Sequence, residues 1–290
     1  MASAELRLIR RRIRSVQSTM KITRAMELIA TSRIAKAQVR VAESQPYTAK
    51  MADVIRNIAA AGGLNHPLLE RRDVNTVGVV IVTSDRGLAG GYNTNVMRLA
   101  ERAMAVHHAS GKATRLYVVG QKANGYFRYR NYQVEHAFLG VTDRPTYNDA
   151  RAVANVLLNE YQEAAVDAVE AFSTRFQSAL TQTAVHWPLL PIEPPEMDGA
   201  EAGKGGYEFE PSPDEILGRL LPRYLEATIF GMLLEASASE HAARRRAMKA
   251  ATENAEELTR VLTREANQAR QAEITTEISE IVGGAEALNG

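Results

Sequence analysis

The sequence predicts an α/β protein in which a long antiparallel coiled coil of the N- and C-terminal helices carries an inserted, Rossmann-like α/β sheet domain. The chain has no proline before Pro46, no glycine before Gly62 and no proline after Pro222, so both ends can form long helices. Between the ends, β-rich runs alternate with polar or amphipathic segments. We expect an N-terminal coiled-coil helix, an α/β domain, a connector and a C-terminal coiled-coil helix at residues 1–60, 74–190, 191–211 and 212–290.

The N-terminal segment has the apolar spacing of a coiled coil. Its seam steps alternately by three and four residues through Leu6, Ile9, Ile13, Val16, Met20 and Thr23. This stripe is narrower than the apolar face of a globular helix. Glu27 interrupts the pattern, and Ile22, Met26 and Ile29 carry a shifted stripe. We therefore expect the seam to change phase near Glu27.

The middle of the chain alternates strand and helix signals. The β-rich runs are TVGVVIV (76–82), RLYVV (115–119), QVEHAFL (133–139), AVEAF (168–172) and TQTAVHW (181–187). Polar or amphipathic segments around 92–110, 121–130 and 147–165 separate them. This alternation predicts an α/β sheet domain.

The C-terminal helix has a marked start. Ser212, Pro213 and Glu215 form a capping box with proline at the first helical position. The Pro-, Gly- and acid-rich segment before it reads as a connector. Two offset apolar stripes follow, first Ala251, Ala255, Leu258, Leu262, Ala266 and Ala269, then Ile274, Ile278, Ile281, Ala285 and Leu288. At 1.5 Å per residue, sixty residues make a rod of roughly 90 Å, and its alanines supply little burial energy, so we expect partners around it.

Composition excludes several classes of protein. The chain has 290 residues, 45% of them apolar, and can bury a substantial core. It has no cysteine, which excludes disulfides, thiolate metal sites and a cysteine nucleophile. No stretch approaches the roughly 18 apolar residues of a membrane-spanning helix. If the protein works at a membrane, another chain has to supply the anchor.

The charge is unevenly distributed although the net charge is only +1. Against two acids, Glu5 and Glu27, residues 1–40 carry Arg7, Arg10, Arg11, Arg12, Arg14, Lys21, Arg24, Arg33, Lys36 and Arg40. A targeting peptide, an RNA-binding arm, a helix that meets an acidic partner and a solvated helix face all fit this pattern.

The segment SDRGLAGGYN (84–93) is the strongest candidate for a ligand loop. It follows a predicted strand and precedes a predicted helix, where phosphate and dinucleotide sites are built. Its glycines, Gly87, Gly90 and Gly91, lack the dinucleotide spacing, and it has no lysine. We interpret it as a strand-to-helix turn, with a ligand loop of backbone amides and Arg86 as the alternative.

No other segment indicates catalysis. GAEAGKGG, from Gly199, has three residues between its glycines where a phosphate loop has four. The six histidines show no spacing that would put two on one helix face with a carboxylate. We therefore predict no catalytic residue, no cofactor and no metal site in this chain.

Three segments together resemble the gamma subunit family of F-type ATP synthases: RLIRRRIRSVQSTMKITRAMELIATSRIAKAQ, SDRGLAGGYN and SEHAARRRAMKAATENAEELTRVLTREANQARQAEITTEISEIVGGAEAL. The resemblance spans essentially the whole chain, and ITTEISEIVGGAEA is its most specific part. It implies a rotor shaft, with the terminal helices inside a ring of alternating alpha and beta subunits. The α/β domain would lie against epsilon and the ring of c subunits. Proton flow would turn the shaft, and the catalytic sites would lie on beta.

The resemblance also implies where the protein works, and the sequence differs from the family at two points. The family pattern starts almost at Met1, which leaves no room for a transit peptide and favours a bacterial protein on the cytoplasmic side of the plasma membrane. Ala89 stands where a cysteine is common in the family. The cysteine-bearing insert of the chloroplast form is missing, so thiol regulation is unsupported.

The expected contacts with beta come from the resemblance, on the matching positions Arg244, Arg270, Gln271, Thr275, Glu277, Met26 and Ala89. Local pattern supports part of this set, because Arg270 and Gln271 lie where one apolar stripe stops and the next begins. Their side chains can turn outward there, and ordinary solvated charge is the alternative. The loop SDRGLAGGYN is expected near the moving arm of beta.

Two other classes of protein compete with the shaft. A coiled-coil nucleic-acid binder would place the N-terminal arginines on phosphates, and its affinity would fall steeply with salt. An enzyme using residues 84–93 would bind nucleotide as an isolated chain. We expect alpha, beta, epsilon and c subunits as partners, and no nucleic acid.

Overall fold

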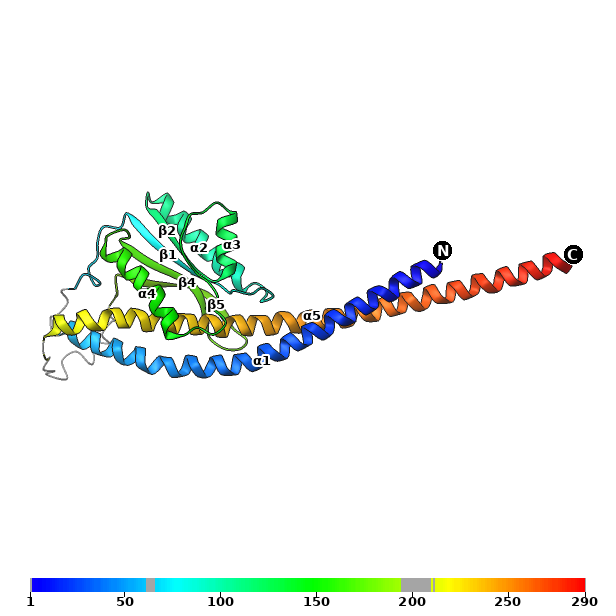
Figure 1. Cartoon of the computed structure of the whole chain (residues 1–290), viewed down its shortest axis with the longest axis horizontal. Helices are drawn as coiled ribbons and strands as arrows, with labels where there is room; N and C mark the ends of the chain where they lie inside the picture. The colour runs from blue at the N-terminus through cyan, green and yellow to red at the C-terminus, as the bar shows by residue number, and fades with distance from the viewer. Residues whose placement is uncertain (1, 61–65, 194–209, 211, 290) are drawn as a thin grey trace. The chain divides into compact units, whose positions relative to one another are not determined.

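The computed structural model describes residues 2–60, 66–193, 210 and 212–289. Two long helices, α1 (Ala2–Ala60) and α5 (Pro213–Asn289), enclose the other elements in the chain order (Figure 1). The chain divides into two compact units: residues 31–244, here the α/β unit, and residues 1–30 with 245–290, here the coil unit. The expected connector at 191–211 lies mostly outside the described residues.

The α/β unit contains one five-stranded sheet in the order β3-β2-β1-β4-β5. The strands are β1 (Thr76–Val82), β2 (Ala113–Val119), β3 (Val134–Phe138), β4 (Ala168–Phe176) and β5 (Gln182–Leu190). The first four are mutually parallel, and β5 pairs antiparallel with β4. The crossover helices are α2 (Tyr92–Ala109), α3 (Gln121–Tyr129) and α4 (Tyr147–Gln162). The predicted α/β sheet domain is confirmed, with every predicted strand and helix in its place.

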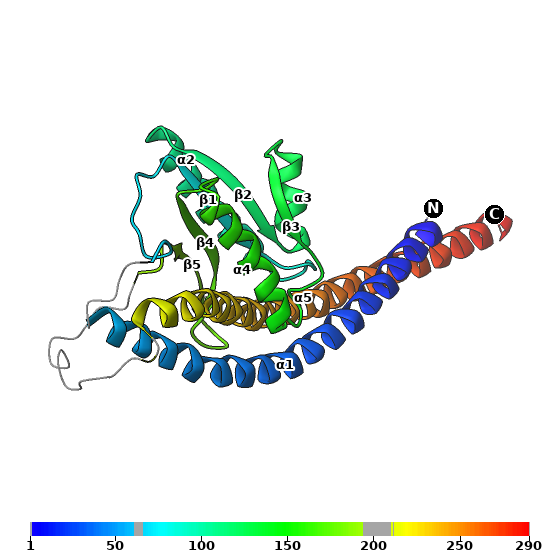
Figure 2. The ribbon, with the colours of Figure 1, turned by 60° about the vertical axis from the view of Figure 1, so that its left-hand side comes forward.

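Helices cover both faces of the sheet (Figure 2). On β1, Val79 and Ile81 belong to the apolar cluster with α2 and α3, whereas Val80 and Val82 belong to the cluster with α4 and α5. Burial on both faces explains why this strand is a continuous apolar run. The cluster on the second face includes five fully buried residues of α5, namely Leu217, Leu221, Leu225, Ile229 and Leu233.

The two prolines inside the long helices do not end them. Pro46 lies within α1 and Pro222 within α5. Around Pro222, the buried side chains of Leu221 and Leu225 fix the helix against the sheet, which offsets the hydrogen bond that proline removes. At the start of α5 the hydroxyl of Ser212 accepts a hydrogen bond from the Glu215 N–H at 3.3 Å, which is one of the two hydrogen bonds of the predicted capping box.

The coil unit is an antiparallel pair of helices with a narrow seam. Leu6 and Thr23 of α1 are buried in it, as are Thr252, Ala255 and other residues of α5. The Oγ1 atoms of Thr23 and Thr252 lie 2.7 Å apart. Both hydroxyls also contact carbonyls of their own helix, so this buried polar pair is satisfied and favours a single register.

The prediction that the coiled-coil seam changes phase near Glu27 is wrong. Ile22 and Ile29 are 58% and 55% exposed, and Met26 is half-buried. The seam instead continues from Thr23 to the buried Ala30, followed along α1 by Ile34, Ala37 and Val41. Two of these seam positions are the small residues Ala30 and Ala37. Because alanine gives a weak apolar signal, the larger Ile22 and Ile29 dominate the apolar pattern of the sequence.

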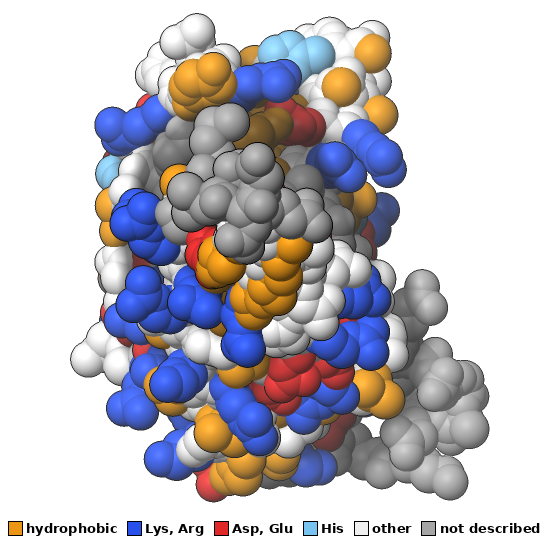
Figure 3. All heavy atoms as spheres, turned by 90° about the vertical axis from the view of Figure 1, so that its right-hand side faces the viewer, with side chains coloured by type: hydrophobic (Ala, Val, Ile, Leu, Met, Phe, Trp, Pro, Cys, Tyr) orange, Lys and Arg blue, Asp and Glu red, His pale blue; other side chains and the backbone are white. Residues whose placement is uncertain are grey.

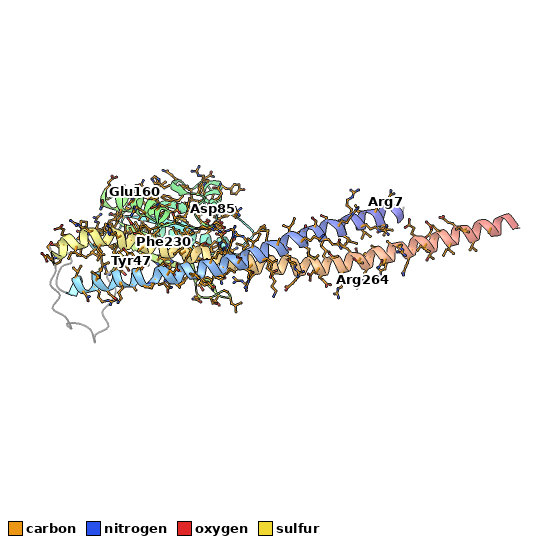
Figure 4. The ribbon with its side chains drawn as sticks, turned by 60° about the horizontal axis from the view of Figure 1, so that its bottom comes forward. Arg7, Tyr47, Asp85, Glu160, Phe230 and Arg264 are labelled. Atoms are coloured by element: carbon orange, nitrogen blue, oxygen red, sulfur yellow. The ribbon has the colours of Figure 1, made fainter. Side chains whose placement is uncertain are left out.

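The last part of α5 extends past the start of α1 (Figures 1 and 4). Because Thr23 faces Thr252 in an antiparallel pair, Ala2 lies level with about residue 273. The second apolar stripe follows this point: Ile274, Ile278 and Ile281 are 43%, 55% and 71% exposed. The side chain of Leu288, the last member of that stripe, is outside the described part. Among the described helices, none combines the length and apolar character that crossing a bilayer requires.

Replacing Gly120 with alanine should destabilise the protein by about 3 kcal/mol or more. Gly120 has φ +97°, and a Cβ there would lie 2.3 Å from the Thr83 carbonyl oxygen. Gly125→Ala is the matched control, because its Cβ would meet nothing within 4 Å and the residue lies inside α3. That change should stabilise by up to about 1 kcal/mol. Urea unfolding followed by circular dichroism measures both, and equal effects would contradict the assigned role of Gly120.

Candidate functional site

The candidate site is the edge of the sheet where the parallel strands end. β1 ends at Val82 and α2 begins at Tyr92, so residues 83–91 form a strand-to-helix turn, as predicted. Leu88 and Gly90 have φ of 63° and 56°, which gives the turn its tight path. The Ser84 N–H donates to Oδ1 of Asn93 at 2.9 Å and ties the start of the turn to α2.

Asp85 joins three loops at this edge. Its carboxylate accepts hydrogen bonds from the N–H groups of Gln121 (3.1 Å), Gly140 (2.9 Å) and Thr142 (3.0 Å), and from Oγ1 of Thr142 (2.9 Å). Burial alone would raise the pKa of Asp85, but these hydrogen bonds outweigh it and the pKa is lowered. One side chain therefore holds together the loops that follow β1, β2 and β3.

Helix α5 lies across the place where α/β sheets usually bind ligands. The strand order reverses between β1 and β4, and the crevice beyond the carboxyl ends of such strands is the common ligand site. Here the Tyr92 hydroxyl donates to the Ala236 carbonyl at 3.1 Å. The Phe176 N–H at the end of β4 donates to Oε2 of Glu235 at 3.1 Å. Because the chain's own helix covers this position, the geometry favours the turn interpretation of residues 84–93 over the nucleotide loop.

The structure brings together Arg244 and Ala89, two of the expected contact residues. Arg244 is 7% exposed, and its guanidinium donates to the Gly87 carbonyl at 3.2 Å and to Oε1 of Glu240 at 2.6 Å. Ala89 is buried against Tyr92 and Ala243. Arg244 therefore holds the turn against α5 from inside the protein.

The other expected contact residues belong to the coil unit. Arg270, Gln271, Thr275 and Glu277 are exposed on two successive turns of α5, and Met26 is half-buried on α1. The Thr275 hydroxyl donates to the carbonyl of Gln271 at 2.9 Å, one turn back. Arg7 of α1 and Arg264 of α5, in the same unit, point away from the helix pair (Figure 4).

Basic side chains are spread over the face of the molecule seen in Figure 3, with apolar side chains between them. In the N-terminal part of α1, the exposed basic residues include Arg10, Arg11, Arg12 and Arg14. Their alternation with the seam residues shows a charged outer face on a coiled-coil helix.

A partly buried cluster of titratable side chains was not predicted from the sequence. A carboxylate oxygen of Asp143, a carboxylate oxygen of Glu240 and an imidazole nitrogen of His241 lie within 4.8 Å of one another. Asp143 is paired with Arg33, and Glu240 with Arg244. Because each carboxylate already has a guanidinium partner, this arrangement favours an internal ion-pair network over a metal site. The sequence gives no signal for it, since Asp143 lies far along the chain from Glu240.

Burial shifts two members of this cluster toward their neutral forms. It raises the pKa of Glu240, against the opposing effect of Arg244. It also lowers the pKa of His241 to about 4, although Asp143 opposes the shift. Oε2 of Glu240 and Nδ1 of His241 are buried without a hydrogen-bond partner in the described structure. Both groups therefore cost stability when they are charged.

Removal of the Asp85 carboxylate should destabilise the protein by about 3 kcal/mol, because Asp85→Ala leaves several loop N–H groups without their acceptor. The measurement is the free energy of unfolding in urea at pH 7. Asp73→Ala, at an exposed position before β1, is the control and should change stability by less than about 0.5 kcal/mol. A loss in Asp85→Ala no larger than in the control would show that the loops hold without this side chain.

His241 should make stability depend on pH. Its folded pKa is about 4 against an ordinary value of 6.5, so its contribution is fully present above pH 6.5 and is lost as the pH falls toward 4. The loss amounts to about 3 kcal/mol. His241→Gln should remove this part of the decline, whereas His108→Gln, at an exposed site, should keep it. Unfolding free energies of the three proteins at pH 7 and pH 4.5 test this, and parallel declines would contradict it.

Comparison with known proteins gives consistent matches over the whole chain. A family model described as ATP synthase matches residues 5–288. The ATP synthase gamma chain of Frankia casuarinae is 50% identical over 295 residues, covering 99% of this chain and 98% of the relative. That of Mycolicibacterium smegmatis is 47% identical over 304 residues, covering 99% of both chains.

Solved structures share the fold. A chain in the Euglena gracilis mitochondrial ATP synthase, in its OSCP/F1/c-ring part, superposes with a TM-score of 0.71 at 16% identity, covering 99% of this chain and 95% of that one. A chain in the rotor of the same synthase gives a TM-score of 0.66 at 17% identity, covering 94% and 99%. At such identities the likeness is one of fold.

Proposed function

This chain belongs to the ATP synthase gamma chain family, and we propose that it is the rotating central shaft of a proton-translocating F-type ATP synthase. Rotation of a membrane ring of c subunits would turn it, and its coil unit would act on the catalytic beta subunits. In this proposal the catalytic residues would lie on the beta subunits.

The observation that carries the proposal is the apolar stripe on the last part of α5. Ile274, Ile278, Ile281 and Val282 are each at least 43% exposed, beyond the level where α1 begins. A regular apolar stripe on a surface marks a contact with another protein. A collar of alpha and beta subunits around the rod would cover this stripe.

A single shaft inside a threefold ring presents different side chains to three identical beta subunits. Each tenfold difference in nucleotide affinity between them corresponds to about 1.4 kcal/mol, which a few charged or hydrogen-bonding contacts can supply. As the shaft turns, the same contacts pass from one beta subunit to the next. The exposed polar residues of α5, Arg270, Gln271, Thr275 and Glu277, are suited to this role because their side chains face outward.

The α/β unit would meet epsilon and the c-ring, so the chain would associate with the membrane only through partners. The curated relatives compared above are bacterial proteins. We therefore place the complex at a bacterial plasma membrane, with this subunit on its cytoplasmic side.

Purification of the tagged chain from native membranes tests the proposal. Recovery of alpha, beta, epsilon and c subunits in a complex that hydrolyses ATP and pumps protons is the expected result. Recovery of nucleic acid in a salt-sensitive complex, without those subunits, would contradict the shaft proposal and favour a nucleic-acid-binding protein.

Arg270→Ala and Gln271→Ala should each slow ATP hydrolysis by the assembled complex. The loss of a hydrogen bond made only at some shaft angles, about 1 to 3 kcal/mol, corresponds to roughly a fivefold to hundredfold decrease. Arg260→Ala is the charge control, since Arg260 pairs with Glu257 on its own helix. Steady-state rates are measured on complexes of verified size. Wild-type rates in all three variants would remove Arg270 and Gln271 from the coupling.

A further inference from the structure

The loop between β3 and α4, residues 139–146, holds helix α1. The carboxylate of Asp143 forms an ion pair with Arg33 of α1. The carbonyl of Pro145 accepts a hydrogen bond from Arg40, two helical turns further along. Two arginines on one face of α1 are thus attached to a single short loop.

The same loop holds helix α5. The Asp143 carbonyl accepts a hydrogen bond from the hydroxyl of Ser237 at 3.1 Å. Oδ1 of Asp143 lies 3.8 Å from Nε2 of His241, one turn further along α5. Ser237 and His241 are 4% and 3% exposed, so this contact lies in the interior. Asp143 therefore forms polar contacts with both long helices.

The loop is in turn fixed to the sheet. Its Gly140 and Thr142 donate to the carboxylate of Asp85, and Oγ1 of Thr142 accepts from the Asp85 N–H at 2.9 Å. At its other end, Thr146 caps α4 in a capping box with Asp149. Hydrogen bonds fix both ends of the loop, one end to Asp85 and the other to α4. A force applied to the α/β sheet can therefore reach Asp143 through these hydrogen bonds.

These contacts lie at the limit of the compact α/β unit. That unit spans residues 31–244, and Arg33 lies two positions inside its start, while His241 lies three positions inside its end. Beyond these residues each helix continues into the coil unit. The loop therefore grips the two helices at the last turn that they share with the sheet.

We propose that the 139–146 loop is the clamp that transmits torque between the α/β domain and the two shaft helices, with Asp143 as its positioning residue. The inference rests on the proposed function of the chain as a shaft. A pair of helices transmits twist from its base with less slippage when both helices are fixed to that base. Through Arg33 on one side and His241 and Ser237 on the other, Asp143 prevents α1 and α5 from shifting separately against the sheet.

Asp143 can be replaced without leaving a buried charge unpaired. Its side chain and that of Arg33 are each 30% exposed, so water can solvate Arg33 when the carboxylate is removed. Asp143→Ala keeps the backbone carbonyl that binds Ser237. We therefore expect the variant to fold and assemble, with a looser hold on α1 and His241.

The test compares two rates in one preparation of the complete complex reconstituted in vesicles: ATP hydrolysis and ATP-driven proton pumping. In Asp143→Ala, pumping per ATP hydrolysed should fall by roughly threefold or more, while hydrolysis stays within about twofold of the wild type. Asp143→Glu should restore the ratio. Asp53→Ala is the matched control, because the ion pairs of Asp53 within the described residues are with Lys50 and Arg56 of its own helix. If Asp143→Ala does not assemble, Arg33→Gln breaks the same ion pair from the other side.

The outcomes separate the clamp from the shaft. A ratio in Asp143→Ala or Arg33→Gln equal to that in Asp53→Ala would overturn the clamp, and so would a parallel fall of both rates, which indicates a purely structural role. A wild-type chain that assembles no pumping complex would instead overturn the proposed function. A second test joins the substitutions Arg33→Cys and Asp143→Cys with a short bismaleimide, which reacts with no other site on this chain because its sequence has no cysteine. Coupled pumping should survive the cross-link, since the clamp stays closed throughout rotation, and its loss would contradict the clamp.

Discussion

The burial of one face of α5 against the sheet is the interaction on which the rest of the structure depends. Five apolar residues of this helix, from Leu217 to Leu233, are almost completely removed from water, each contributing about 2 kcal/mol. This packing fixes where α5 leaves the sheet. It therefore places Glu235, Arg244 and the residues between them at the carboxyl ends of the strands, where they cover the usual ligand crevice of an α/β fold. The same helix then continues, without a break, as one half of the coil.

At the carboxyl edge of the sheet, polar and charged side chains are removed from water, which destabilises the fold wherever they lack hydrogen-bond partners. Asp85 is satisfied by several donors and stabilises three loops, whereas Glu240 and His241 are buried with an unpaired atom each. In some proteins, buried charged groups fix one arrangement among several apolar alternatives. Here the network of Arg33, Asp143, Glu240 and Arg244 sets the positions of α1 and α5 relative to the loops. Such a fixed geometry matters more for a part that transmits force than for one that only has to fold.

The coil unit has the opposite character. Its seam uses alanine and threonine at many positions, which allows the helices to approach closely but buries little apolar area. A notch of about 260 Å³ opens between them, lined by Ser15, Val16, Thr19, Asn254, Ala255 and Leu258. Together with the exposed isoleucines at the end of α5, this thin packing is suited to a rod that completes its burial inside a ring of other subunits.

The sequence by itself determined the two long helices, the strands of the sheet, the turn after β1 and the seam from Leu6 to Thr23, because each follows from the spacing of neighbouring residues. It failed near Glu27, where the small side chain of Ala30 lies in the seam and the larger Ile29 lies outside it. Only the tertiary structure decided that Arg244 faces the turn at Gly87, that Asp85 joins three loops and that Asp143 meets both long helices. These contacts join residues far apart in the chain. Periodicity shows which face of a helix is apolar, but packing alone decides which distant polar group that helix meets.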